Sequence, residues 1–133
     1  MIITNSDGGA RGNPGPGAIG VLVRNNESIL EICSEKIGNS TNNIAEYKAL
    51  IKALELASKY AKDEVVCVLD SELVVKQLLG EYRVKDRKLI ELFREVQKMQ
   101  ENFKKIKYIH VGREDQFQQI VDNALNMELD GKN

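Results

Sequence analysis

The chain has 133 residues, of which 42% are hydrophobic and 29% are charged. This length and composition are typical of one globular domain, and they exclude a disordered tail. The apolar runs are far too short for a membrane span, and the first residues lack the basic and apolar segments of a secretory signal. The net charge of −1 excludes a global positive field that would attract nucleic acid. We therefore expect a single domain over residues 1–133, in the cytoplasm and without a membrane partner.

The hydrophobic pattern predicts three strands, followed by alternating helices and strands. Residues 8–17 hold five glycines and two prolines, so we expect a loop between the first two strands. This order predicts a mixed α/β sheet with helices packed on it. The expected strands are 2–6, 18–24, 28–36, 64–69 and 106–111, and the expected helices are 43–59, 71–79, 86–101 and 117–129.

Charge is unevenly distributed along the chain. The segment Lys76–Lys107 holds ten Lys or Arg and five Asp or Glu, which leaves a charge of −6 for the rest. Such a basic half could contact a polyanion, although charge alone favours a solvated helix face. The single histidine, His110, argues against a multi-histidine metal site. Cys33 and Cys67 lie in apolar runs and are expected to be core residues.

Three acidic residues occupy unusual positions. Asp7 and Asp70 each follow an apolar strand, and parallel neighbouring strands would bring both carboxylates to one sheet edge. The alternative is that each aspartate caps a turn or helix. Glu46 lies on the apolar face of its predicted helix, where a carboxylate needs a partner or a metal. Its alternative is a capping box with Asn43.

A fourth acid, Asp122, lies at the edge of the apolar face of the last predicted helix, where it would alone be a solvated residue. A cluster of carboxylates without histidine or thiolate partners suits Mg²⁺ or Mn²⁺. Such a cluster indicates phosphoryl chemistry, with two metals on the attacking and leaving oxygens. The G-x-G-x-x-G pattern at residues 15–20 does not indicate a dinucleotide site, because a strand follows it instead of a helix.

Four segments, at residues 7–17, 41–50, 70–77 and 121–126, resemble the motifs of type 1 ribonuclease H. The resemblance covers nearly the whole chain. It implies the ribonuclease H-like fold, a five-stranded mixed α/β sheet flanked by helices. It also implies an endonuclease that hydrolyses the RNA strand of RNA/DNA hybrids and leaves 5′-phosphate and 3′-hydroxyl ends. The chain resembles a short form without a hybrid-binding domain or basic handle, and we expect a monomer.

The resemblance also implies roles for single residues. Two ions, Mg²⁺ or Mn²⁺, would be held by four catalytic acids, with the first bridging both ions: Asp7, Glu46, Asp70 and Asp122. The hybrid would be contacted by the glycine-rich segment, the start of the first helix and the third motif: Gly8, Gly9, Arg11, Asn13, Asn42, Asn43, Ser71 and Glu72. Amide side chains and glycine backbone suit the shallow minor groove of an A-like hybrid, which displays its 2′-hydroxyls.

The last motif departs from the family pattern. Asp122 follows His110 by twelve residues instead of the usual ten, which we interpret as a two-residue expansion within 116–120, looped out ahead of Asp122. Glu114 and Asp115 are the alternatives for the fourth acid. Candidates for assisting product release or proton transfer are His110, Arg113 and Glu114, with a structural role as the alternative for each.

Two further functions stay open from the sequence. A hybrid- or nucleic-acid-binding domain of this fold could have weak or lost catalysis because of the altered loop before Asp122. Another metal-dependent nuclease of the superfamily, such as a resolvase or an exonuclease, is the third reading. The glycine-rich segment and the motif around Glu46 argue against this third reading.

Overall fold

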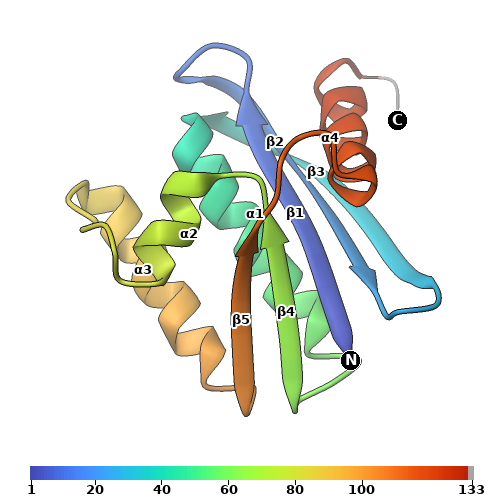
Figure 1. Ribbon diagram of the computed structural model, residues 1–133. Helices are drawn as coiled ribbons and strands as arrows, with labels where there is room; N and C mark the ends of the chain where they lie inside the picture. Colours follow the sequence, from blue (N-terminus) through green and yellow to red (C-terminus); the bar gives the residue numbers. More distant parts are fainter. Residues whose placement is uncertain (132–133) are drawn as a thin grey trace.

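The computed structural model describes residues 1–131, and Figure 1 shows their path from the N-terminus to the C-terminus. These residues form a mixed α/β structure in which strands and helices alternate after an initial run of strands. The strands are β1 (Ile2–Ala10), β2 (Gly15–Arg24), β3 (Ile29–Ser40), β4 (Glu64–Leu69) and β5 (Lys105–His110). The helices are α1 (Asn42–Ala57), α2 (Glu72–Leu78), α3 (Arg87–Gln100) and α4 (Gln116–Leu129).

The strands form one five-stranded sheet with the order β3-β2-β1-β4-β5. The β1–β2 and β2–β3 pairs are antiparallel, whereas β1–β4 and β4–β5 are parallel. The near-continuous apolar run of β4 is buried because this strand has a neighbour on each side and lies in the interior of the fold. The mixed five-stranded sheet expected from the sequence is confirmed.

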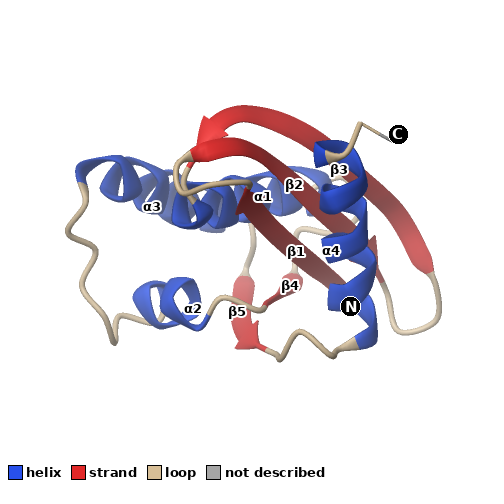
Figure 2. Ribbon diagram, turned by 90° about the horizontal axis from the view of Figure 1, so that it is seen from above, coloured by secondary structure: helices blue, strands red, loops and turns tan. Residues whose placement is uncertain are grey.

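Helices cover both faces of the sheet. Helices α1 and α3 lie on one face, and α4 lies on the other, across β1, β2 and β3 (Figures 1 and 2). The main core fills the space under α1 and α3, because both helices present an apolar stripe to the sheet. It is built from Tyr47, Leu50 and Leu54 of α1, Leu92 and Val96 of α3, and Val21, Val23 and Val65 of the sheet.

The first strand is longer than predicted. It does not end before Asp7 but continues to Ala10, because residues 8–10 pair with residues 17–19 of β2. The predicted loop over 8–17 therefore shrinks to residues 11–14. Its first glycine lies in the strand for a packing reason: a Cβ on Gly8 would lie 2.2 Å from the carbonyl carbon of Ala45 in α1. The glycine allows the helix to approach the sheet.

The start of α4 agrees within one residue with the predicted helix over 117–129, but the predicted loop-out ahead of Asp122 is wrong. Residues 116–120 do not loop out but form the beginning of the helix, which starts at Gln116. Asp115 is the N-cap, and its side chain accepts hydrogen bonds from the backbone N–H groups of Phe117 and Gln118. The two additional residues between His110 and Asp122 therefore do not produce a loop within 116–120, which is helical.

Both cysteines are free, and Cys67 is fully buried in β4, as expected for a core residue. Among residues 1–131, none of the helices has the length and apolar character that crossing a membrane requires.

Candidate active site

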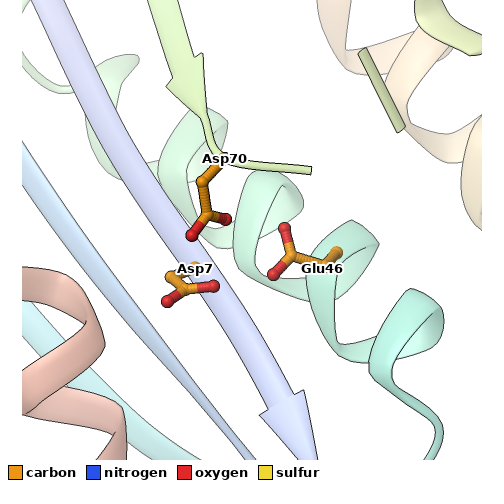
Figure 3. A group of neighbouring side chains, drawn as sticks. All are labelled: Asp7, Glu46 and Asp70. Carbon is orange, nitrogen blue, oxygen red and sulfur yellow. The ribbon is translucent and has the colours of Figure 1, made fainter. Parts of the chain in front are cut away.

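Three carboxylates meet at the edge of the sheet. Asp7 of β1, Glu46 of α1 and Asp70 after β4 each offer an oxygen, and these oxygens lie within 4.8 Å of one another (Figure 3). The parallel pairing of β1 with β4 ends at Ser6 and Leu69, so both aspartates directly follow the last pair. The predicted meeting of Asp7 and Asp70 at one sheet edge is therefore confirmed by the topology.

Glu46 is held by the strand and not by its own helix. Its side chain is buried, and Oε1 accepts a hydrogen bond from the Gly8 backbone N–H at 3.0 Å. The N-cap of α1 is Thr41, whose side chain accepts from the N–H of Ile44. The capping box with Asn43 is therefore wrong. The other oxygen of Glu46, Oε2, is buried and has no hydrogen-bond partner in the part of the chain that the structure describes.

The cluster holds more negative charge than its surroundings can stabilise. Burial raises the pKa of Asp7, and the adjacent Glu46 carboxyl and the charges of Asp70 and Asp122 raise it further. Burial also raises the pKa of Glu46 to about 7. The pKa of Asp70 is raised by burial, while the nearby Arg113 partly opposes the shift. Without a cation, the cluster retains protons around neutral pH.

These features test whether a divalent cation would fit. The three acids supply only oxygen ligands, which hard cations such as Mg²⁺ prefer. A cation would give the buried Glu46 Oε2 a partner and would compensate the repulsion that raises the pKa values. The residues therefore fit a metal ion.

Asp122 lies on the wall of the same cavity. This cavity has a volume of about 480 Å³, and Asp122 enters it from α4 on the far face of the sheet. The side chain is exposed, and its charge raises the pKa of both Asp7 and Asp70. Residues of all four predicted motifs line the cavity, together with Arg113 and Leu129. The motif residues are Asp7, Gly8, Gly9, Ala10, Arg11, Asn42, Asn43, Glu46, Asp70, Ser71, Asp122, Leu125 and Asn126.

Neither alternative for the fourth acid reaches this cavity. Asp115 caps α4 through the N–H groups of its first turn. The carboxylate of Glu114 lies against Gly112, where an added Cβ would be 2.3 Å from Oε1. Of the three candidates for the fourth acid, Glu114, Asp115 and Asp122, only Asp122 lines the cavity.

Two of the predicted substrate-contacting asparagines, Asn13 and Asn42, are linked by hydrogen bonds; Asn42 lines the cavity, whereas Asn13 lies outside its lining. Asn13 Oδ1 accepts from the Asn42 backbone N–H at 3.0 Å, and Asn42 Oδ1 accepts from the Ala10 backbone N–H at 2.9 Å. These bonds tie the 11–14 turn to the start of α1. Because each carbonyl oxygen is engaged with backbone, the NH₂ group is the part of each side chain that suits a ligand. Asn43 lines the cavity beside Asn42.

Of the other predicted substrate-contacting residues, Ser71 and Arg11 line the cavity and Glu72 does not. Ser71 lines the cavity while its hydroxyl accepts from the Val74 N–H and caps α2. Arg11 also lines the cavity, and its guanidinium pairs with the carboxylate of Asp130, the C-cap of α4, at 2.6 Å. Glu72 is exposed, pairs with Lys76 and lies outside the cavity lining.

Of the three candidates for assisting product release or proton transfer, one lines the cavity and two do not. His110 is exposed at the end of β5 and lies outside the cavity lining, as does Glu114. Arg113 lines the cavity, and its positive charge lowers the pKa of Glu46 and Asp70. Arg113 is therefore the auxiliary candidate that the structure brings to the acids.

Gln118 is a buried polar residue beside the site that was not predicted from the sequence. Gln118 of α4 is 1% exposed; its Oε1 accepts from Asn5 Nδ2 and its Nε2 donates to the Ser6 carbonyl, both at 2.9 Å. A signal was present, because Gln118 precedes Val121 by three residues and Leu125 by seven, which places it on the buried stripe.

The chain is similar to known nucleases over most of its length. The model of the family described as "Reverse transcriptase-like" matches residues 5–122. The bifunctional protein Rv2228c of Mycobacterium tuberculosis is 38% identical over 114 residues, which are 84% of this chain and 31% of that protein. Ribonuclease HI of Halobacterium salinarum is 48% identical over 81 residues, 60% of this chain and 41% of that protein. The chain thus spans less than half the length of these curated relatives.

Solved structures match this fold over nearly the whole chain. The structure of LC11-RNase H1 in complex with RNA/DNA hybrid matches with a TM-score of 0.90 and 38% identity, and it covers 98% of both chains. RNase H1 from the halophilic archaeon Halobacterium salinarum matches with a TM-score of 0.92 and 34% identity, again over 98% of both chains. With its mixed sheet, its three-acid cluster and these relatives, the chain belongs to the type 1 ribonuclease H family.

Proposed function

We propose that this chain is an endonuclease that hydrolyses the RNA strand of RNA/DNA hybrids and leaves 5′-phosphate and 3′-hydroxyl ends. The observation that carries the proposal is the cluster of Asp7, Glu46 and Asp70 with its unpartnered buried Glu46 oxygen. The related LC11-RNase H1, whose structure is known with an RNA/DNA hybrid, supports the substrate class.

Asp7, Glu46, Asp70 and Asp122 would hold two divalent ions, Mg²⁺ or Mn²⁺, with Asp7 between them. Such ions, when bound, supply an activated water and stabilise the charge on the attacking and leaving oxygens of a phosphodiester. The protein fixes the ligands in advance. The Gly8 N–H orients Glu46, and the parallel β1–β4 pair sets the spacing of the two aspartates.

The rim of the cavity would recognise the hybrid. The backbone of Gly8 and Gly9 allows close approach of a nucleic-acid strand, since neither residue has a side chain. The NH₂ groups of Asn13, Asn42 and Asn43 are suited to donate to acceptors in the minor groove, where an RNA strand displays 2′-hydroxyls. Arg113 would attract the phosphate that lies next to the acids.

The altered spacing before Asp122 no longer supports a non-catalytic binding domain. That reading rested on the altered spacing before Asp122, yet residues 116–120 are helical and Asp122 still lines the cavity. Catalysis is therefore the function we propose. We propose further that residues 1–133 act as one ribonuclease H domain. The monomeric state and the cytoplasmic location expected from the sequence stay predictions.

Cleavage of an end-labelled RNA/DNA hybrid tests the function. The full chain is incubated with Mg²⁺, with Mn²⁺ or with chelator, and single-stranded RNA and duplex DNA are the control substrates. We expect internal cuts in the RNA strand of the hybrid with either metal and none with chelator. Binding of the hybrid without cleavage would favour the binding domain, and equal cleavage in chelator would exclude the metal mechanism.

A further inference from the structure

A buried polar network joins α4 to the sheet beside the acids. Gln118 bridges two atoms of β1: it accepts from the Asn5 side chain and donates to the Ser6 carbonyl. Arg24 of β2 donates through Nε to Asn5 Oδ1 at 3.0 Å. The residue that follows Ser6 in β1 is Asp7, so the network ends next to the acid cluster.

The network continues around the first turn of α4. The Arg24 guanidinium lies over the Phe117 ring, with its carbon 3.9 Å from the ring centroid. Asp115 caps the turn through the N–H groups of Phe117 and Gln118, and its charge opposes the effect of burial on the pKa of Arg24. The beginning of the helix is thus bound to β1 and β2 by directional contacts.

Gly20 allows the same helix to approach the sheet closely. Gly20 of β2 pairs with Asp7, and a Cβ on Gly20 would lie 2.3 Å from the Val121 carbonyl oxygen. A Cβ on Gly9 would lie 3.7 Å from a methyl group of Leu125. Val121 directly precedes Asp122, so α4 contacts the sheet within one residue of the fourth acid.

Gln118, Val121 and Leu125 form one stripe, and each contacts the sheet at a different point. Of these contacts, only those of Gln118 are hydrogen bonds made by the side chain, and hydrogen bonds specify rotation and register in a way that apolar contacts do not. A slide or rotation of α4 would break both of them and would move the Asp122 carboxylate relative to Asp7.

We propose that Gln118, oriented by Asn5 and Arg24, is a positioning residue that sets the register of α4 and so holds Asp122 in place for the metal ion at the acid cluster. The inference rests on the proposed function, because it takes Asp122 as a metal ligand. It goes beyond that function by assigning a role to a residue that lies outside the cavity lining.

The test replaces Gln118 with methionine, which has a similar length but makes neither hydrogen bond. Gln119→Met is the matched control, since Gln119 is the exposed neighbour on the same helix. MnCl₂ is titrated into the full chain by calorimetry. We expect Gln118→Met to weaken Mn²⁺ binding about 10-fold, the order seen when a residue supporting a metal ligand is lost. Gln119→Met should bind as the unmodified chain does.

A double-mutant cycle separates positioning from general stability. If Gln118 acts through Asp122, the Gln118→Met/Asp122→Asn variant should bind Mn²⁺ as Asp122→Asn alone does. Independent, multiplying losses would overturn the proposal, as would an unchanged Mn²⁺ affinity in Gln118→Met. Cleavage of the hybrid gives a second readout: the Mg²⁺ concentration for half-maximal rate should rise, while the KM for the hybrid stays within about 2-fold.

Arg24→Met covers the case in which Gln118→Met does not fold. Methionine keeps the packing on Phe117 but cannot donate to Asn5, so a smaller weakening of Mn²⁺ binding is expected. Unchanged binding in Arg24→Met would then contradict the proposal. Failure of the proposed function gives a different result: Asp122→Asn itself would leave Mn²⁺ binding unchanged, or the unmodified chain would not cleave the hybrid.

Discussion

The Gly8 backbone N–H donates a 3.0 Å hydrogen bond to Glu46, and it can do so because Gly8 has no side chain to keep α1 away. A Cβ at this position would lie 2.2 Å from the carbonyl carbon of Ala45, which precedes Glu46 in the helix. One glycine therefore brings the helix to the strand and also orients the acid that the helix carries.

Gly8→Ala should separate α1 from β1 and destabilise the fold. Forcing extra volume into a packed contact costs about 1–3 kcal/mol, so the free energy of unfolding should fall by that order. Gly9→Ala is the control, because its Cβ would have an ordinary contact with Leu125 at 3.7 Å. Urea unfolding of both variants measures the difference. Equal stability of the two would contradict the close approach of the helix.

Asp7→Asn should abolish cleavage. An amide is a poorer metal ligand than a carboxylate, and Asp7 is the acid proposed to lie between both ions. We expect a loss on the order of 10³-fold or more in kcat, which corresponds to at least about 4 kcal/mol of transition-state stabilisation. Circular dichroism checks that the variant is folded. A variant that keeps a tenth of the activity would show that Asp7 does not have this position.

The stability of the metal-free protein should decrease with rising pH. The pKa values of Asp7 and Glu46 are raised in the folded state, so unfolding releases protons above the unfolded values near 4. The free energy of unfolding should therefore fall from about pH 4 through neutral pH. Asp7→Asn should be more stable than the unmodified chain at pH 8 by about 1–3 kcal/mol, with little difference near pH 4. Thermal unfolding in chelator measures this, and a difference that shrinks with rising pH would contradict it.

The extent to which the sequence predicted the site depended on whether the determining contact was local. The meeting of Asp7 and Asp70 was predictable, since apolar strand ends can be recognised in the sequence and parallel strands share an edge. The partner of Glu46 was not, because a local capping box and a distant strand N–H compete for the same carboxylate. The length of β1 depended on pairing with β2, which the glycines of residues 8–10 concealed.

The start of α4 shows the same limit. The spacing from His110 suggested an inserted loop within residues 116–120, which include three glutamines, yet Asp115 caps this segment as the first turn of a helix. The spacing of Gln118 to Val121 and Leu125 indicates the buried face of α4, but its hydrogen-bond partners Asn5 and Ser6 lie on a strand more than a hundred residues away and cannot be predicted locally. The family resemblance predicted Asp122 as the fourth acid, whereas the spacing from His110 argued against it; α4 begins at Gln116 and Asp122 still lines the cavity, in agreement with the resemblance.

Asp122→Asn should reduce Mg²⁺-supported cleavage more than Mn²⁺-supported cleavage, because Mn²⁺ binds oxygen and nitrogen ligands more tightly and tolerates the loss of one charge better. Glu114→Gln should leave cleavage unchanged, since Glu114 does not line the cavity. Asp115→Ala should lower stability by about 1 kcal/mol through loss of the α4 cap. Rates in both metals and urea unfolding measure these effects. A silent Asp122→Asn beside an inactive Glu114→Gln would show that the assigned fourth acid is wrong.

The basic segment between α2 and α3 should contribute to hybrid binding through phosphate contacts. Arg83 and Lys85 are exposed in this segment, and Lys88 is exposed in the first turn of α3. Each phosphate contact releases counterions with a slope of about 0.7–0.9 in log affinity against log salt. Replacing all three with alanine should weaken binding and flatten the salt dependence by about two units if most of them contact phosphates.

The matched control for this triple variant removes three lysines at the opposite, amino-terminal edge of β4 and β5. Lys62, Lys104 and Lys105 lie there, so their replacement with alanine changes the net charge equally but far from the acids. Fluorescence anisotropy with the hybrid, in chelator to prevent cleavage, gives affinity over a range of salt concentrations. The control should keep the slope of the unmodified chain, because counterions are released only where protein and phosphate meet. Equal slopes in all three proteins would assign Arg83, Lys85 and Lys88 to the solvated surface that charge alone favours.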